Sequence, residues 1–170
     1  MTAGTRPRNG ASTSSSNGWL SPIRSRPFQL QAQAPQGEPP PTFLSFLNQT
    51  RIESDDRDNA GLIQWQPWPY LLERAESWES GQSEIVLKAR QLGFSWLVAA
   101  YAVWLAGWHV SAHVALYSAG EREAKELLRK CRYIHANHPN APAGTFNKTD
   151  AEFATGSRII AFPSTEQTGI

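Results

Sequence analysis

The chain has 170 residues, of which 40% are apolar, and this length suits one hydrophobic core better than two. Its 16 basic and 15 acidic residues give a formal net charge of +1, so overall charge gives no reason to expect nucleic acid or membrane surfaces as partners. The single cysteine excludes a disulfide framework within the chain.

Residues 1–41 differ in composition from the rest of the chain. They hold seven of the 12 prolines and a run of five serine and threonine residues. Such a stretch buries too little apolar area to offset its chain entropy, so it predicts a disordered tail before a domain at 42–170. Its arginines, serines and scarcity of acidic residues are also typical of an organelle transit peptide, an alternative that its prolines and glycines disfavour.

The first part of the domain predicts two helices joined by a loop. Apolar residues at helical spacing follow Thr42, which is a suitable N-cap. Residues 51–59 are mostly charged or polar and predict a loop. Pro69 suits the first turn of a second helix, which Gly81 is expected to end.

The centre of the chain predicts a strand, a turn, a helix and a second strand. The short apolar run at 84–89 predicts a buried strand, and residues 113–117 predict another. Between them, residues 95–105 predict an almost wholly apolar helix that Gly107 should end. About 30 residues lead from the start of the first strand to the start of the second, as a right-handed βαβ unit requires.

The last part of the domain predicts an amphipathic helix and a hairpin. Ser118 and Glu121 form a capping-box pattern at the head of the helix. The helix should bury one stripe of residues and carry two i,i+4 ion pairs outside: Ala124, Leu127, Leu128, Cys131 and Ile134, with Glu121–Lys125 and Glu126–Lys130. Residues 152–154 and 158–162 flank a Thr-Gly-Ser turn and predict the hairpin.

The turn before the apolar helix resembles a phosphate-binding loop. It reads Lys88, Ala89, Arg90, Gln91, Leu92, Gly93, Phe94 and Ser95. The P-loop pattern G-x-x-x-x-G-K-[ST] wraps phosphates with backbone N–H groups at a helix N-terminus. Here Gly93 and Ser95 match, whereas Lys88 replaces the first glycine and Phe94 replaces the usual lysine. Lys88 reaches the phosphates from the opposite end of the loop in this interpretation, and Arg90 offers a bidentate contact.

This loop, directly after an apolar run and before an apolar helix, resembles the deviant Walker A loop of the large terminase subunits of tailed bacteriophages. Those subunits are ATP-driven motors that package double-stranded viral DNA. The resemblance implies that Lys88 serves as the phosphate lysine and that Arg90 is an arginine finger on the γ-phosphate. It also implies ATP and Mg²⁺ as cofactors, with the hydroxyl of Ser95 on the metal, and it implies the α/β fold of a P-loop NTPase with a three-layer parallel sheet.

Three further stretches support the resemblance, which spans residues 63–170. Residues 65–70 look like the family's adenine-binding segment, with Gln66 as the expected base-reading residue and Gln64 as the second choice. Residues 117–119 at a strand end look like the family's second motor strand. Residues 156–165 resemble the strand that precedes the Walker B segment.

The family's Walker B aspartate, catalytic glutamate and nuclease carboxylates have no counterpart up to Ile170. We therefore expect an incomplete sheet and an N-terminal fragment of the motor, from a truncated gene, a prophage remnant or an interrupted reading frame, with negligible ATP hydrolysis of its own. The resemblance implies that the full-length protein is an ATPase and nuclease in the cytoplasm of a bacterial host. Its expected partners are double-stranded DNA, a small terminase subunit, a portal ring and further copies in a ring.

Several simpler interpretations stay open. Lys88 and Arg90 are solvated charges at a strand end if the loop has decayed into a non-catalytic nucleotide-binding or interaction module. Residues 93–96 also resemble the nucleophile elbow G-x-S-x-G, but Leu97 occupies a position that needs a small residue.

Membrane and zinc alternatives are weaker. The apolar stretch at 96–105 is short for a membrane span, which needs about 20 residues. Cys131, His135 and His138 follow helical spacing but lack a second ligand pair, which disfavours zinc.

Overall fold

The computed structural model describes residues 1, 41–54, 56, 58, 60–89 and 92–164 of the chain. The prediction of a disordered tail at 1–41 therefore lies almost wholly outside the described residues. Within them the chain forms helices and strands in this order: α1 (Phe43–Gln49), β1 (Arg51–Ser54), β2 (Gly61–Gln64), α2 (Pro69–Glu79), α3 (Phe94–Trp108), β3 (His113–Ser118), α4 (Glu121–Asn137), β4 (Gly144–Phe146), β5 (Asp150–Phe153) and β6 (Arg158–Pro163).

The strands form two sheets. β1 and β2 make an antiparallel ribbon, and the other four strands make a mixed sheet in the order β3-β6-β5-β4. In the mixed sheet β3 runs parallel to β6, while β5 pairs antiparallel with both β6 and β4. The chain is thus α/β as predicted. In its one described parallel strand pair, β3 and β6, the helix that lies between the two strands in sequence is α4 and not α3.

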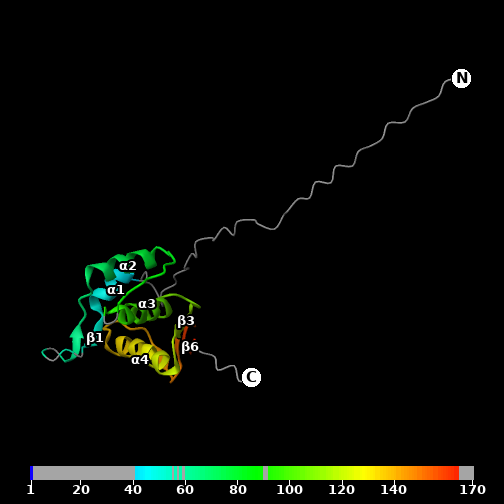
Figure 1. Ribbon diagram of the computed structural model, residues 1–170. Helices are drawn as coiled ribbons and strands as arrows, with labels where there is room; N and C mark the ends of the chain where they lie inside the picture. Colours follow the sequence, from blue (N-terminus) through cyan, green and yellow to red (C-terminus); the bar gives the residue numbers. More distant parts are fainter. Residues whose placement is uncertain (2–40, 55, 57, 59, 90–91, 165–170) are drawn as a thin grey trace.

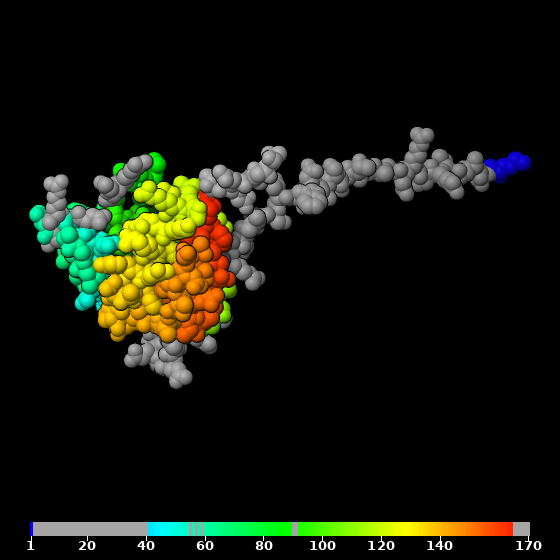
Figure 2. Space-filling view, turned by 90° about the horizontal axis from the view of Figure 1, so that it is seen from below, coloured from blue at the N-terminus to red at the C-terminus, as the bar shows by residue number. Residues whose placement is uncertain are grey.

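Helices α3 and α4 pack together on one face of the mixed sheet, and α1 and α2 pack on α3 (Figure 1). The space-filling view shows α4, in yellow, beside the C-terminal strands in orange to red (Figure 2). On the opposite face of the sheet, the β3 side chains of His113, Ala115 and Tyr117 are exposed. Among the described residues, helices cover one face of this sheet and the β3 side chains on the other face are exposed. The described arrangement therefore has two layers, one of helices and one of strands, and not the predicted three.

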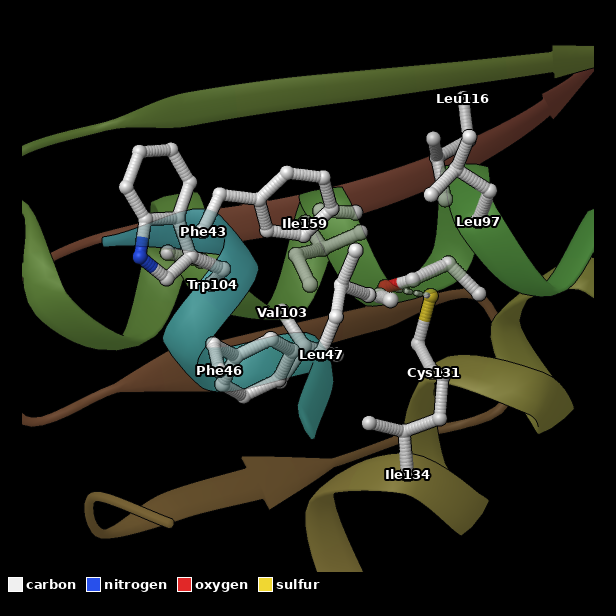
Figure 3. Packing of buried hydrophobic residues seen from close by; sticks show 14 of the residues in the cluster. Phe43, Phe46, Leu47, Leu97, Val103, Trp104, Leu116, Cys131, Ile134 and Ile159 are labelled. Atoms are coloured by element: carbon white, nitrogen blue, oxygen red, sulfur yellow. Dashed lines mark hydrogen bonds between the residues drawn. The ribbon is translucent and has the colours of Figure 1, made fainter. Parts of the chain in front are cut away.

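The core is built around α3, which is apolar on nearly every side and buries residues along its whole length. From one side α1 contributes Phe43, Phe46 and Leu47, all fully buried (Figure 3). From the other side α4 contributes Cys131 and Ile134. The Cys131 thiol donates to the backbone oxygen of Ala99 at 3.7 Å, and burial raises its pKa to about 12, so this cysteine behaves as a core residue.

The predicted buried strand at 84–89 is wrong. These residues have no regular secondary structure, and Ile85 and Leu87 are fully exposed at 102% of their reference area. An apolar run becomes a buried strand only where neighbouring strands satisfy its backbone groups. The described strands lie elsewhere, because β3 pairs with β6 and not with this segment.

Three predicted boundaries also change. The first half of the loop predicted at 51–59 is strand β1, because its backbone pairs with β2. Gly107 lies inside α3 rather than ending it, and a side chain there would meet the Pro142 ring, with Cγ only 2.8 Å from an added Cβ. Ser118 ends β3, so Gly120 and not Ser118 is the N-cap of α4, without a side-chain cap.

The other helix and hairpin predictions are confirmed. Thr42 caps α1 by accepting a hydrogen bond from the Ser45 backbone N–H at 3.1 Å. α2 begins at Pro69, and Gly81 follows its end at a φ of 78°. β5 and β6 form the expected hairpin. No helix in the described ranges is long and apolar enough to span a membrane.

Two buried histidines predict how stability depends on pH. His138 stacks on Phe46 at 4.4 Å between ring centroids, and its Nδ1 accepts from the Asn140 N–H. Burial lowers the pKa of His138, and likewise that of His109, below the ordinary value. Below a pH of about 6.5 the unfolded chain therefore binds more protons than the folded one, so stability is complete above that pH and is lost as the pH falls.

We expect the melting temperature to drop between about pH 7 and about pH 5, and His138→Asn to reduce that drop. Calorimetry across this range measures the effect. The exposed His113 supplies the control, since His113→Gln should leave the pH slope unchanged. Equal slopes in all three proteins would contradict the assignment.

Candidate nucleotide-binding site

The loop that opens α3 is shaped by Gly93. This residue is the N-cap of α3 and adopts a left-handed conformation with φ 74° and ψ −1°. Glycine takes up this conformation without steric cost, and an added Cβ would lie 3.3 Å from Leu71 Cδ1 of α2. The carbonyl oxygen of Gly93 accepts from the N–H groups of Trp96 and Leu97. The predicted glycine of the phosphate loop is thus required by the turn.

The first turn of α3 presents backbone donors. No side chain caps this helix N-terminus. The N–H groups of Phe94 and Ser95, in the first turn, have no partner within the helix, because the first backbone hydrogen bonds of α3 are donated by Trp96 and Leu97. Together with the helix dipole they form an environment that favours an anion.

Several of the predicted site residues line one cavity of about 510 Å³. Lys88, Leu92, Gly93, Phe94 and Ser95 line it together. The other lining residues come from β1, α3 and α4: Ile52, Glu53 and Ser54, then Trp96, then Lys130. Lys88 and the start of α3 therefore face the same space although the strand expected before Lys88 is missing. The Lys88 amine lies 5.9 Å from the centre of the Phe94 ring and donates to the Ala89 backbone oxygen at 3.3 Å.

The segment before α2 is tied to this loop. The Tyr70 hydroxyl donates to the Leu92 backbone oxygen at 2.6 Å. Trp68, the N-cap of α2, is 65% exposed, and Gln66 is exposed too. Gln66 is not part of the described lining of the Lys88 cavity. Gln64 instead donates to the backbone oxygens of Asn48 and Thr50, which fixes the ribbon to α1.

Arg90 and Gln91 fall outside the described residues, so the predicted arginine finger has no structural account. Ala89 is exposed beside Lys88. Lys88 and residues 92–95 line one cavity, whereas Ala89 is not in its described lining, and the role of these residues in phosphate binding stays a prediction. Lys88 does not point away from the start of α3 to a separate surface, because both line one cavity.

Lys130 is a cation that the sequence interpretation assigned only to an outer ion pair. Its amine lies 2.9 Å from Glu126 and 4.4 Å from the centre of the Trp96 ring. It lines the Lys88 cavity and also a second cavity of about 430 Å³ with Ser95 and Ser118. The i,i+4 spacing predicted the ion pair of Lys130 with Glu126. It did not predict that Lys130 lines the two cavities, because that depends on how α3 packs on α4.

Two of the carboxylates that line these cavities, those of Glu53 and Glu126, are paired with a cation. The Arg129 guanidinium bonds Glu126 through two nitrogens at 2.8 and 2.9 Å and Glu53 through the third at 2.7 Å. The hydrogen bond from Arg129 is the largest cause that lowers the pKa of Glu126 to about 2. Glu126 therefore stays ionised, and the pairing of Glu53 and Glu126 with Arg129 makes both carboxylates poor metal ligands or general bases.

Two alternative sites find no support in the described residues. No group of three His, Cys, Asp or Glu side chains there is arranged to hold a metal ion. The His135 Nε2 atom lies 2.7 Å from the Pro142 carbonyl oxygen, so this ring nitrogen is engaged in a hydrogen bond. Of the two cavities that Ser95 lines, neither has a histidine in its described lining, as a nucleophile elbow requires.

Neither the known protein families nor the curated proteins that were compared with the chain give a match.

Proposed function

We propose that this chain carries the nucleotide-binding part of the ATPase motor domain of a terminase-type DNA-packaging protein. The observation that supports the proposal best is the shared cavity of Lys88, Gly93 and Ser95 at the uncapped N-terminus of α3. The N–H groups and dipole of a helix start suit a phosphate, and a lysine across the same cavity supplies the neutralising charge.

The proposed roles of Lys88, the first α3 turn and Ser95 are supported by their shared cavity, whereas those of Arg90 and Gln66 rest on the sequence resemblance alone. Lys88 meets the β- and γ-phosphates, the amides of the first α3 turn cradle them, and the Ser95 hydroxyl contacts Mg²⁺ that arrives with ATP. Arg90 acts as the finger on the γ-phosphate, and Gln66 reads the adenine edge. In a full-length relative, the motor would act in the bacterial cytoplasm with double-stranded DNA, a small terminase subunit, a portal ring and further copies in a ring.

The chain is proposed to bind ATP without hydrolysing it at a useful rate. Of the acidic residues that line the described cavities near Ser95, Glu53 and Glu126 are paired with Arg129, and Glu123 lines the second cavity but is not in the described lining of the Lys88 cavity. A Mg²⁺-coordinating and water-orienting carboxylate needs to be free of such pairing. ATP and Mg²⁺ are therefore expected as ligands rather than as substrates that turn over.

An interaction module is the second candidate function. It is favoured by the exposed apolar run Ile85, Val86 and Leu87 directly before the loop. Exposed contiguous apolar residues of this kind often mark a contact with another chain. In that case the loop residues are solvated charges and the cavity has no nucleotide.

Isothermal titration of the full chain with ATP tests the proposal. We expect saturable binding that weakens when Mg²⁺ is removed with a chelator, and phosphate release no faster than in buffer. Ser95→Ala should reduce the effect of Mg²⁺ while keeping binding of ATP alone. Absence of ATP binding with an intact fold would favour the interaction module and overturn the nucleotide site.

A further inference from the structure

The mixed sheet has an open edge beside an apolar groove. In the part of the chain that the structure describes, β3 is the terminal strand and pairs only with β6. Next to it lies a groove of about 610 Å³. Its floor is α3, through Val98, Tyr101, Ala102 and Leu105, and its far wall is the end of α2 with the residues that follow, 78–83. An unpaired strand edge over an apolar floor is an arrangement that accepts an additional strand.

The surroundings define which strand would fit this groove. One face of an added strand would lie on α3, where the groove is apolar. Its other face would continue the outer side of β3, where Ala115 and Tyr117 are exposed to solvent. A strand between an apolar floor and water needs apolar and polar residues in alternation, and a continuous apolar run would leave side chains in water. The run Ile85–Leu87 does not meet this condition.

The chain itself contains a segment with this alternation. Residues 28–34 read Phe-Gln-Leu-Gln-Ala-Gln-Ala, with apolar residues at every second position over seven residues and no charge. Pro27 and Pro35 flank the segment, and proline is tolerated at the ends of an edge strand. We propose that residues 28–34 pair with the open edge of β3, with Phe28, Leu30 and Ala32 on the α3 floor and the glutamines toward water.

The point at which the N-terminal segment joins the domain places it within reach of the groove. The Trp104 indole N–H donates to the Pro41 carbonyl oxygen at 2.8 Å, which fixes Pro41 to α3. Trp104 stacks on Tyr101 at 5.6 Å between ring centroids, and Tyr101 lines the groove. The seven residue steps from Ala34 to Pro41 span up to about 23 Å, whereas one helical turn is only about 5.4 Å. The linker is therefore longer than the one helical turn that separates Trp104 from the groove residue Tyr101.

Hydrogen exchange of the full chain tests this pairing. Ala112 and Ser118 accept hydrogen bonds from β6 and the residue that follows it, so by alternation the amides of Ala115 and Tyr117 point away from β6 toward the open edge. A strand added to β3 protects these amides from exchange. Leu30→Asp places a charge on the apolar floor and should speed exchange of the affected β3 amides by about tenfold or more. Gln31→Asp places the same charge on the outward face and should leave them unchanged. Amides in the core of α4 report whether the fold is intact in each variant.

Three results would overturn the proposal. The first is equal β3 exchange in the wild type and in Leu30→Asp, with no protection in either. The second is equal acceleration by Leu30→Asp and Gln31→Asp, since only a defined inward face distinguishes the two positions. The third is β3 protection that rises with protein concentration together with dimer formation in sedimentation, which would assign the edge to a second copy. None of these measurements depends on whether the chain binds ATP.

Discussion

Phe46→Ala is expected to lower the free energy of unfolding by about 3–5 kcal/mol. Phe46 is fully buried on α1 in the hydrophobic core (Figure 3). Its ring lies near three others, one of them on the same helix. Its centroid lies 6.3 Å from that of Phe43, 5.3 Å from that of Trp108 and 4.4 Å from that of His138. The substitution removes the contact of α1 with the end of α3 and leaves a cavity that the surrounding rings fill only in part.

Urea denaturation followed by tryptophan fluorescence measures this loss. Leu62→Ala is the matched control, because Leu62 lies on β2 and is 47% exposed, so its truncation should cost less than about 1 kcal/mol. A change below about 1 kcal/mol for Phe46→Ala would show that α1 does not pack into this core in solution.

Lys88→Ala is expected to weaken ATP binding by about tenfold to a hundredfold. A charge-assisted hydrogen bond contributes about 1.5–3 kcal/mol, and about 1.4 kcal/mol corresponds to a factor of ten in affinity. Lys88 is exposed, and among the described residues the hydrogen bond of its amine goes to the Ala89 backbone oxygen, so the amine is available to a phosphate in the same cavity. Lys88→Arg should retain part of the affinity because the charge is kept.

Calorimetric titration of ATP into each variant measures the change. Lys125→Ala is the control, because this exposed lysine lies on α4, pairs with Glu121 and does not line the Lys88 cavity. Equal affinity of Lys88→Ala and the wild type would remove Lys88 from the site. Equal losses in Lys88→Ala and Lys125→Ala would instead indicate that overall charge, and not the cavity, controls ATP binding.

The sequence predicted the elements whose stability is local. Thr42 and Pro69 mark the starts of α1 and α2 because capping and the fixed proline φ act within one turn. The stripe of α4 is buried at Ala124, Leu128 and Ile134 since one apolar face at helical spacing is sufficient to predict it. The β5–β6 hairpin follows from two short strands around Gly156. For the candidate site, the sequence indicated the Gly93 turn and the start of α3.

The tertiary structure decided what depends on partners distant in sequence. Residues 84–89 have a strand-like composition but no described neighbour to pair with, and Arg51–Ser54 is charged yet forms β1 because β2 lies beside it. Gly107 continues α3 because its missing side chain admits the Pro142 ring. Lys130 reaches the candidate site only through the packing of α4 on α3. Backbone pairing and side-chain packing between distant segments contribute free energy that a local sequence pattern does not reveal. The local pattern therefore predicted the helices, whereas the tertiary structure determined which segments pair as strands and which residues line the cavity.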